Sequence, residues 1–287
     1  MLNAAELPLN SRKAVYHMDL TPEEIAETII TVGDPQRVPH VSRYFDAIEL
    51  TRQHRELVTH TGRIGSKRIS VVATGMGMPN IDIVMNELDA LFNINLETRE
   101  PHKNLRSFKL VRLGTTGAIQ PDHAPGTFIM SRYAIGFDTL MNYYVRPKNK
   151  NLETLQQQLK GHLQQDSDAF FVTECPGELS KVFSGFAEKG ITATCGGFYG
   201  PQSRRLRIPL RYQNLFSRLS TFTFDNLPVT NIEMETAAIL GLGEMLGHQC
   251  TSLNVVLANR ALGTFSDNIE KNIDNLIEKA LSKIEAI

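Results

Sequence analysis

The chain has 287 residues, 41% of them hydrophobic, so it can form one large α/β domain or two smaller ones. Its formal net charge of −1 excludes the long-range positive field that draws a protein to nucleic acid or to an anionic membrane, so any basic site must be local. The N-terminal segment lacks the apolar stretch of a signal peptide, and no apolar run approaches the length of a membrane span.

The predicted elements alternate between strands and helices. In chain order we expect strands at 28–33 and 68–78, a helix at 80–94, strands at 109–119 and 126–136, helices at 151–165 and 177–190, a strand at 191–197, a strand at 228–235 that runs into a helix at 236–247, a strand at 251–260 and a helix over 268–287. Short apolar runs indicate the strands and helical spacing of apolar residues indicates the helices; Gly190 is expected to end the helix before it.

This alternation is typical of an α/β fold with a central mixed β-sheet flanked by helices. No repeat, low-complexity tract or linker divides the chain, so we predict one domain over residues 1–287. The polar stretch at 95–107 is predicted to be an exposed excursion.

Three cysteines, Cys175, Cys195 and Cys250, are widely spaced and include no CxxC pair. This pattern argues against a disulfide framework or a zinc knuckle and predicts a reducing, cytoplasmic location. We expect Cys195 to be a buried small hydrophobe rather than a nucleophile.

The first two strand ends are rich in glycine, and ligands of open α/β sheets collect where strands end and loops begin. GDPQR at 33–37 offers Gly33 for close backbone approach and places Arg37 near a helix N-terminus begun by Pro35, where free N–H groups favour an anion. TGMGMPN at 74–80 is able to cradle a phosphate but matches neither nucleotide-binding fingerprint. Taken alone, GDPQR is better explained as an ordinary turn with Arg37 at the surface, and TGMGMPN is a weak signal.

The third strand end, RLGTTGAI at 112–119, holds hydrogen-bond donors. Arg112 provides a bidentate fork for phosphate, and the hydroxyls of Thr115 and Thr116 add donors. Arg37, Arg112 and Thr115 are therefore able to form one small anion site. The alternative is a plain strand-ending turn.

The fourth strand end, NIEMET at 231–236, places Glu233 and Glu235 on either side of Met234 at the start of a helix. Acidic residues at a helix N-terminus are ordinary capping chemistry. The functional alternative is that a carboxylate accepts two hydrogen bonds from the cis-diol of a sugar while Met234 packs against the sugar face.

The stretch CGGFYGPQSRRLR at 195–207 contains aromatic rings beside Gln202 and Arg204. It is either a surface turn entering a basic, solvated helix or a pocket that binds the polar edge of a flat heterocycle. An anion site, a diol acceptor and a heterocycle binder together indicate a nucleoside and phosphate as ligands.

In this order of motifs the chain resembles the hexameric nucleoside phosphorylase family, and within it the uridine phosphorylases, over nearly its whole length. The motifs are VYHMDL (15–20), GDPQR (33–37), HRE (54–56), TGMG (74–77), RLGTTGAIQP (112–121), FYGPQSR (198–204), NIEMET (231–236) and VLANR (256–260). The resemblance implies a distorted-barrel sheet and phosphorolysis of uridine to uracil and ribose 1-phosphate. It also implies a homohexamer, built as a trimer of dimers that share active sites, with phosphate as a co-substrate and no metal or organic cofactor.

The resemblance also implies a role for each site residue. It assigns phosphate to Gly33, Arg37, Arg112 and Thr115. It assigns ribose to Glu233, Met234 and Glu235. It assigns the base to Thr116, Gly117, Phe198, Gln202 and Arg204. Two residues would act across a subunit boundary, Arg55 on the phosphate and His17 on the ribose 5′-hydroxyl. The implied catalytic set is Arg112, Gln202, Arg204 and Glu235.

Gln202 and Arg204 suit uracil chemically. A glutamine amide has one acceptor and two donors, so it matches an adjacent carbonyl and N–H of the base. Arg204 has donors only and would stabilise the negative charge that grows on the departing base. Loss of one such donor costs about 10²–10³ in rate.

Two departures from the family pattern matter. Some relatives bind potassium between subunits through a Glu and a Ser; Glu56 matches the first, but Asn80 replaces the second, which argues against the ion. Purine-cleaving relatives use an Asp directly after the last core strand, where this chain has Asn259 and Arg260. Asp267, the expected N-cap of the C-terminal helix, keeps the purine alternative open.

Two further alternatives are a nucleosidase and a non-catalytic RNA-binding module. A nucleosidase would use water in place of phosphate, but such relatives lack the arginine set to which Arg37 and Arg112 belong. The RNA-binding module would use a run of basic residues, Arg204, Arg205, Arg207 and Arg211. A net charge near zero and the absence of an RNP, KH or helix-turn-helix pattern argue against it.

Overall fold

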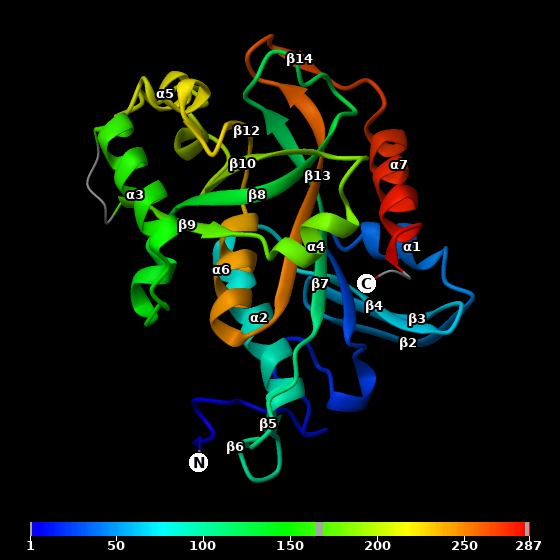
Figure 1. Cartoon of the computed structure of the whole chain (residues 1–287). Helices are drawn as coiled ribbons and strands as arrows, with labels where there is room; N and C mark the ends of the chain where they lie inside the picture. Colours follow the sequence, from blue (N-terminus) through cyan, green and yellow to red (C-terminus); the bar gives the residue numbers. More distant parts are fainter. Residues whose placement is uncertain (1, 165–168, 285–286) are drawn as a thin grey trace.

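The computed structural model describes residues 2–164, 169–284 and 287 (Figure 1). Its strands are β1 (Thr28–Val32), β2 (Ala47–His54), β3 (Leu57–Ile64), β4 (Lys67–Ala73), β5 (Ile94–Asn95), β6 (Glu100–Pro101), β7 (Lys109–Ala118), β8 (Phe128–Phe137), β9 (Phe171–Glu174), β10 (Glu188–Cys195), β11 (Thr223–Phe224), β12 (Leu227–Glu233), β13 (Gln249–Asn259) and β14 (Thr264–Phe265). Its α-helices are α1 (Arg37–Ser42), α2 (Met78–Asn93), α3 (Lys150–Leu163), α4 (Gly177–Val182), α5 (Leu215–Thr221), α6 (Thr236–Leu246) and α7 (Ile269–Leu281).

Most of the strands join one sheet, whose main path runs β11-β12-β10-β8-β13-β7-β1-β4-β3-β2. β12 also pairs antiparallel with β7, where Ile232 lies opposite Gly117. This second pairing closes β12, β10, β8, β13 and β7 into a ring. β7 runs parallel to β13 and β1, whereas β13 and β8 are antiparallel, so the prediction of a mixed, barrel-like sheet is confirmed.

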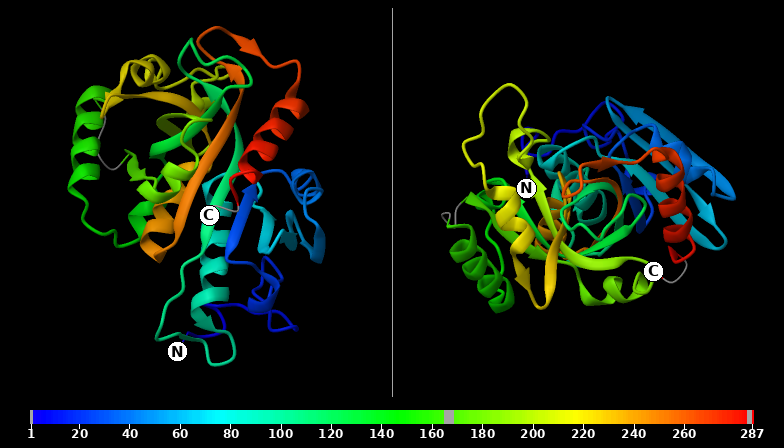
Figure 2. Two further views of the ribbon diagram at one scale, coloured as in Figure 1. Left: turned by 45° about the vertical axis from the view of Figure 1, so that its right-hand side comes forward. Right: turned by 90° about the horizontal axis from the view of Figure 1, so that it is seen from above.

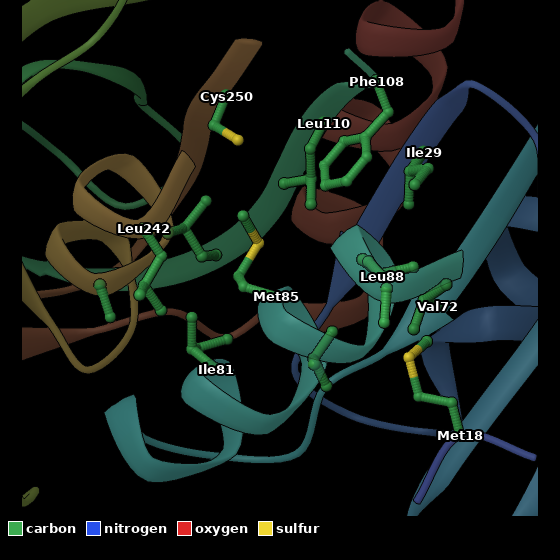
Figure 3. Close-up of a cluster of buried hydrophobic side chains, with 14 of the residues drawn as sticks. Met18, Ile29, Val72, Ile81, Met85, Leu88, Phe108, Leu110, Leu242 and Cys250 are labelled. Carbon is green, nitrogen blue, oxygen red and sulfur yellow. The ribbon is translucent and has the colours of Figure 1, made fainter. Parts of the chain in front are cut away.

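A hydrophobic core lies between the sheet and two helices, α2 and α6 (Figure 3). α2 turns Ile81, Met85 and Leu88 toward this core, which is the spacing of a helix with one apolar face. α6 is buried along most of its length and contributes Leu242. Burial on this scale fixes α6 against the barrel, and with it the residues just before the helix.

Helices α3 and α7 lie on opposite sides of the barrel (Figure 2). The side chain of Asn149 caps α3 by accepting the N–H groups of residues 151 and 152. The expectation that Asp267 caps α7 is wrong, because Asn268 occupies the N-cap position and makes no side-chain cap. Residues 165, 285 and 286 of the predicted helices lie outside the described residues.

The helix predicted at 177–190 is wrong in its second half. α4 ends at Val182, and Gly190 lies within β10 instead of ending a helix. A Cβ at Gly190 would overlap the side chain of Thr230 on β12. Close packing of two strands therefore requires this glycine.

The hairpin of β2 and β3 was not among the predicted elements. Its turn consists of Arg55 and Glu56, with no glycine or asparagine to mark it, and Arg55 adopts left-handed backbone with φ of 55°. Burial alternates along the first half of β3, but its residues Leu57, Val58, Thr59 and His60 do not alternate between apolar and polar, so the sequence carried no period-two signal there.

The stretch at 95–107 is an exposed excursion, as predicted, and contains the short strands β5 and β6. It lies beside the N-terminal segment (Figure 1), where the backbone N–H of Leu2 donates to the carbonyl of Arg99. Within the described part of the chain, no helix has the length and apolar character needed to span a bilayer.

Candidate active site

Arg112 is buried in β7 with its side chain only 5% exposed. Nη1 donates to Oδ1 of Asn254 at 2.7 Å. Nη2 donates to Oε2 of Glu235 and lies 3.3 Å from Oε2 of Glu233. A buried charge is tolerated only when it is paired and hydrogen-bonded, and both edges of this guanidinium have partners.

Opposing effects act on the pKa values of this cluster. Burial lowers the pKa of Arg112, but the negative charges of Glu233 and Glu235 outweigh it and hold the pKa above its ordinary value. Burial raises the pKa of the Glu235 carboxyl, against the attraction of Arg112. The guanidinium therefore stays charged, and Glu235 takes up a proton at higher pH than an ordinary glutamate.

Glu233 and Glu235 have different partners. The Glu233 carboxylate accepts the backbone N–H groups of Glu235 and Thr236 at 2.9–3.1 Å and the hydroxyl of Thr194 at 2.6 Å. It therefore caps the first turn of α6. Oε1 of Glu235 instead accepts the N–H of Gly77 at 2.6 Å. The capping alternative thus holds for Glu233, whereas Glu235 faces the arginine and the glycine-rich turn.

The two glycine-rich turns lie against each other. A Cβ at Gly33 would be 3.5 Å from the carbonyl oxygen of Gly75. Gly75 and Gly77 have φ of 72° and 91°, a region that favours glycine. This turn directs the N–H of Gly77 at Glu235. Met234 borders it, since a Cβ at Gly77 would lie 3.9 Å from the Met234 Cε.

Arg37 begins α1 directly, rather than lying a turn inside a helix started at Pro35. Burial lowers its pKa, and the charges of Arg112 and Glu235 act on it in opposite directions. Arg37 therefore lies within electrostatic reach of the Arg112 cluster, and the charge of Asp34 acts on it as well. Thr115 is half-buried in β7, and no hydrogen bond within the described residues joins its hydroxyl to either arginine.

The loop after β10 holds the residues predicted to bind a base. A 3₁₀ turn, Gly200–Gln202, is followed by Ser203 in left-handed backbone with φ of 57°. This reversal returns Arg204 to Phe198, with the guanidinium carbon 3.8 Å from the ring centroid. Nη1 of Arg204 donates to the Phe198 carbonyl at 2.7 Å and also to Oε1 of Gln202.

Gln202 and Phe198 differ in exposure, at 2% and 50%. Burial lowers the pKa of Arg204 to about 10, and the charge of Arg260 adds to this effect. The loop predicted to bind the base thus combines one buried amide with a half-buried cation and an exposed ring.

Arg260, which sequence reasoning treated only as a departure from purine-cleaving relatives, belongs to this loop. Its Nη1 donates to the backbone carbonyl of Gln202 at 2.8 Å. A Cβ at Gly117 would lie 3.2 Å from the Arg260 Cγ. Arg260 therefore joins β7 to the base-binding loop. An arginine directly after the last core strand is the signal that could have identified it.

The hydroxyl of Thr116 is hydrogen-bonded to residues of the neighbouring strand β12. It donates to the carbonyl of Ile232 at 2.8 Å and accepts Nδ2 of Asn231 at 2.9 Å. These bonds tie β7 to β12 at the closure of the barrel. Thr116 therefore contributes a rigid wall, while its hydroxyl is already committed.

His17 and Arg55 lie together at a different place. They line a cavity of about 140 Å³ whose other lining residues are Glu56, Leu57, Asn80 and Ile83. Nδ1 of His17 lies 2.6 Å from Glu87 Oε1. Within the described residues no hydrogen bond or ion pair joins His17 or Arg55 to Arg112 or Glu235. The structure thus does not bring these two residues to the Arg112 cluster of the same chain.

Cys195 and Asp267 differ in burial. Burial raises the pKa of the Cys195 thiol to about 12, so the thiolate is scarce at neutral pH. The other two cysteines are also buried and free. Asp267 is exposed. Among the described residues no group of three or more His, Cys, Asp or Glu side chains is placed to hold a metal ion.

Comparison with known proteins adds independent support. The family model of the phosphorylase superfamily matches residues 27–287. A uridine phosphorylase of Thermococcus kodakarensis is 30% identical over 287 residues, covering 99% of this chain and 89% of the relative. A purine nucleoside phosphorylase of Listeria welshimeri is 26% identical over 241 residues, covering 84% and 85%.

A solved structure shows the same likeness. The Trypanosoma brucei nucleoside phosphorylase, reported to show uridine phosphorylase activity, superposes with a TM-score of 0.87 at 28% identity, covering 98% of this chain and 100% of that chain. The matched length, the closed mixed sheet and the ordered motifs agree, so this chain belongs to the phosphorylase superfamily.

Proposed function

We propose that this protein cleaves uridine with phosphate and releases uracil and ribose 1-phosphate. The observation that supports this most directly is the Arg112–Glu235 pair, which lies beside a second arginine and two glycine-rich turns. One half of the pair suits phosphate and the other suits a sugar diol. Relatives with both sequence and structural likeness are uridine phosphorylases.

Phosphate binds at Arg37 and Arg112, with Gly33 and Thr115 beside them. Of these two arginines, Arg112 is ion-paired, whereas Arg37 makes no ion pair with another described residue, although the charge of Asp34 acts on it; its donors are therefore available to an anion. Arg112 presents Nη2, which donates to Glu235 in this structure and would donate to phosphate as well. Two guanidinium groups offer planar sets of N–H donors that fit the oxygens of a phosphate.

Ribose binds at Glu235. A carboxylate has lone pairs to accept both hydroxyls of a cis-diol, and Glu235 must be ionised to do so. Met234 borders the same turn and packs under the sugar. Glu233 acts indirectly here, because its oxygens are occupied by α6 and it fixes the backbone that carries Glu235.

Uracil binds at the loop of Phe198, Gln202 and Arg204, against a wall formed by Thr116 and Gly117. Arg204 has donors only, so it holds Oε1 of Gln202 and leaves the amide N–H group free to donate to a uracil carbonyl. The half-exposed ring of Phe198 is available to stack on the base once the Arg204 guanidinium, which lies over that ring, moves from it toward a uracil carbonyl.

The reaction needs no covalent nucleophile. A phosphate oxygen bonds to C1′ with inversion as the C1′–N1 bond breaks and its electron pair leaves with uracil. Arg204 stabilises the resulting negative charge on the base, which then takes a proton from solvent. Positioning and preorganised charge supply most of the acceleration.

The proposal includes no metal or organic cofactor. Glu56 and Asn80 both lie beside Gly75, and the expectation that no potassium ion binds there stays a prediction.

The same proposal includes a homohexamer built from dimers, in a cytoplasmic location. The cavity lined by His17 and Arg55 supports shared sites, because both residues are separate from the Arg112 cluster of their own chain. A partner subunit would supply them to complete each phosphate and ribose site. Light scattering of the purified protein tests the assembly. Restored activity after mixing Arg112 and His17 variants would test the sharing.

The decisive experiment measures release of free base from uridine and from inosine, each with and without phosphate. We expect uracil release that depends on phosphate, with inosine inert. Inosine cleavage would indicate a purine nucleoside phosphorylase and move attention to Asp267. Base release without phosphate would indicate a nucleosidase and contradict the role of the two arginines.

A further inference from the structure

We infer that Asn254 is a positioning residue for phosphate, which holds one edge of the Arg112 guanidinium and keeps the other edge directed at the binding site. The inference rests on the proposed function, because it takes Arg112 as a phosphate ligand. Asn254 belongs to none of the motifs by which the chain resembles its family. Its role therefore follows from the contacts described here.

Asn254 is fully buried in β13, opposite Gly114 of β7. Ser252 lies opposite Arg112 in the same parallel ladder. Alternate residues of a strand share one face, so Ser252 and Asn254 project to the same side of β13. On that side Oδ1 of Asn254 accepts Nη1 of Arg112 at 2.7 Å.

The neighbours of Asn254 determine which way its amide points. Arginine has donors only, so the amide must present its oxygen to Arg112. Nδ2 then donates to Oγ of Ser252 at 3.1 Å, and that hydroxyl pairs with the hydroxyl of Thr236 at 2.8 Å. A reversed amide would place N–H groups against Arg112. The network therefore links the guanidinium to the first turn of α6, which Glu235 directly precedes.

Gly114 forms the adjoining wall. A Cβ at Gly114 would overlap both Nη1 of Arg112 and Oδ1 of Asn254. The guanidinium therefore lies in a slot with Asn254 at one edge and the carboxylates of Glu233 and Glu235 at the other. The Nη2 edge has partners too, so phosphate reaches Arg112 there only by taking a share of the Nη2 donors from Glu235, which turns its lone pairs to the sugar hydroxyls. A fork held in place in advance loses less side-chain entropy when the anion binds.

The test is Asn254→Leu, which removes the acceptor and keeps the number and branching of the side-chain heavy atoms. We expect KM for phosphate to rise about tenfold or more, the scale of one hydrogen bond to a charged group, with a smaller change in KM for uridine. Calorimetric titration with inorganic phosphate alone should show the same weakening without any turnover. Should the leucine variant not fold, Asn254→Ala removes the acceptor without added bulk, and the same shift is expected.

Two controls separate positioning from general damage. Asn93→Leu removes another buried amide, at the far end of α2, and should leave KM for phosphate unchanged. In an Arg112→Lys background, Asn254→Leu should cost no further phosphate affinity, because lysine has no second edge to hold. A purely structural effect would instead add to that of Arg112→Lys.

The failures are distinguishable. Wild-type protein that releases no uracil with phosphate would refute the proposed function. An active wild type whose folded Asn254 variants keep the wild-type KM for phosphate would refute only the positioning role. The positioning role would also be refuted if Asn254→Leu cost as much phosphate affinity in the Arg112→Lys background as in wild type, or if Asn93→Leu cost as much as Asn254→Leu.

Discussion

The sugar–phosphate end and the base end of the candidate site are built differently. At the first, Arg112 and Glu235 lie on or beside strands of the closed barrel and are bonded on several sides. At the second, Arg204 and Phe198 lie on a loop after β10, half-buried and half exposed. Gln202 is the buried exception in that loop.

This difference separates what the family shares from what selects the substrate. Phosphate and the sugar recur in every phosphorolysis of a nucleoside, and a rigid barrel can hold their binding residues in place permanently. The base varies, and loops tolerate sequence changes that strands do not. We therefore expect substitutions at the barrel end to cost both stability and activity, and those at the loop end to cost activity alone.

The largest effect is expected for Arg112→Leu. It removes a proposed phosphate ligand and leaves Glu233 and Glu235 as buried carboxylates without their arginine. We expect kcat/KM to fall about 10³-fold or more and the free energy of unfolding to fall by about 3–5 kcal/mol. Steady-state kinetics and denaturant melts measure the two effects. An inactive variant with wild-type stability would contradict the view that this pair also supports the barrel.

Arg204→Gln is expected to reduce kcat by about 10²–10³-fold with little change in melting temperature. Because the pKa of Arg204 is lowered to about 10, wild-type activity should also fall as pH rises through that value. The variant should lack this alkaline limb. Arg205→Gln, an exposed neighbour, is the control and should keep both rate and pH profile.

The two glutamates provide a matched pair within the barrel end. Glu235→Gln should reduce kcat/KM for uridine about 10- to 100-fold, because a neutral amide accepts the sugar hydroxyls less strongly. Glu233→Gln should mainly lower stability, by about 1 kcal/mol, through loss of the charged cap on α6. Equal kinetic losses in both variants would show that Glu233 also contacts the sugar.

The raised pKa of Glu235 predicts opposite pH trends for activity and stability. Activity needs the ionised form, so the acid limb of kcat/KM should lie above the ordinary glutamate value of about 4.3. Since its folded pKa exceeds its unfolded one, the stability contribution of Glu235 is full below the unfolded pKa and is lost as pH rises through the folded pKa. The free energy of unfolding of Glu235→Gln, subtracted from that of wild type at each pH, isolates the contribution of Glu235. Parallel trends would contradict the raised pKa.

The smallest effect is expected for Asp267→Asn. This residue is exposed, so uridine cleavage should change less than about twofold. The measurement is kcat/KM for uridine, together with inosine cleavage as a check on the purine alternative. A large loss with either nucleoside would mean that the base end extends beyond the loop of Gln202 and Arg204.

The sequence by itself determined the alternation of strands and helices, most element positions and the motifs at the strand ends. These signals are local: hydrophobic period, turn residues, and short runs such as RLGTTGAI. They were weakest where local chemistry was ambiguous. Gly190 resembled a helix stop and proved to be required by a strand contact with Thr230, and the turn at Arg55 carried no glycine to mark the β2–β3 hairpin.

Only the tertiary structure decided how side chains distant in sequence share partners. It assigned Glu233 to the cap of α6 and Glu235 to Arg112, although the two glutamates look alike in the sequence. It also brought Asn254 to Arg112 and Arg260 to Gln202. The reason is physical: burial, hydrogen-bond partners and pKa shifts depend on which strands become neighbours, and barrel closure joins segments more than a hundred residues apart.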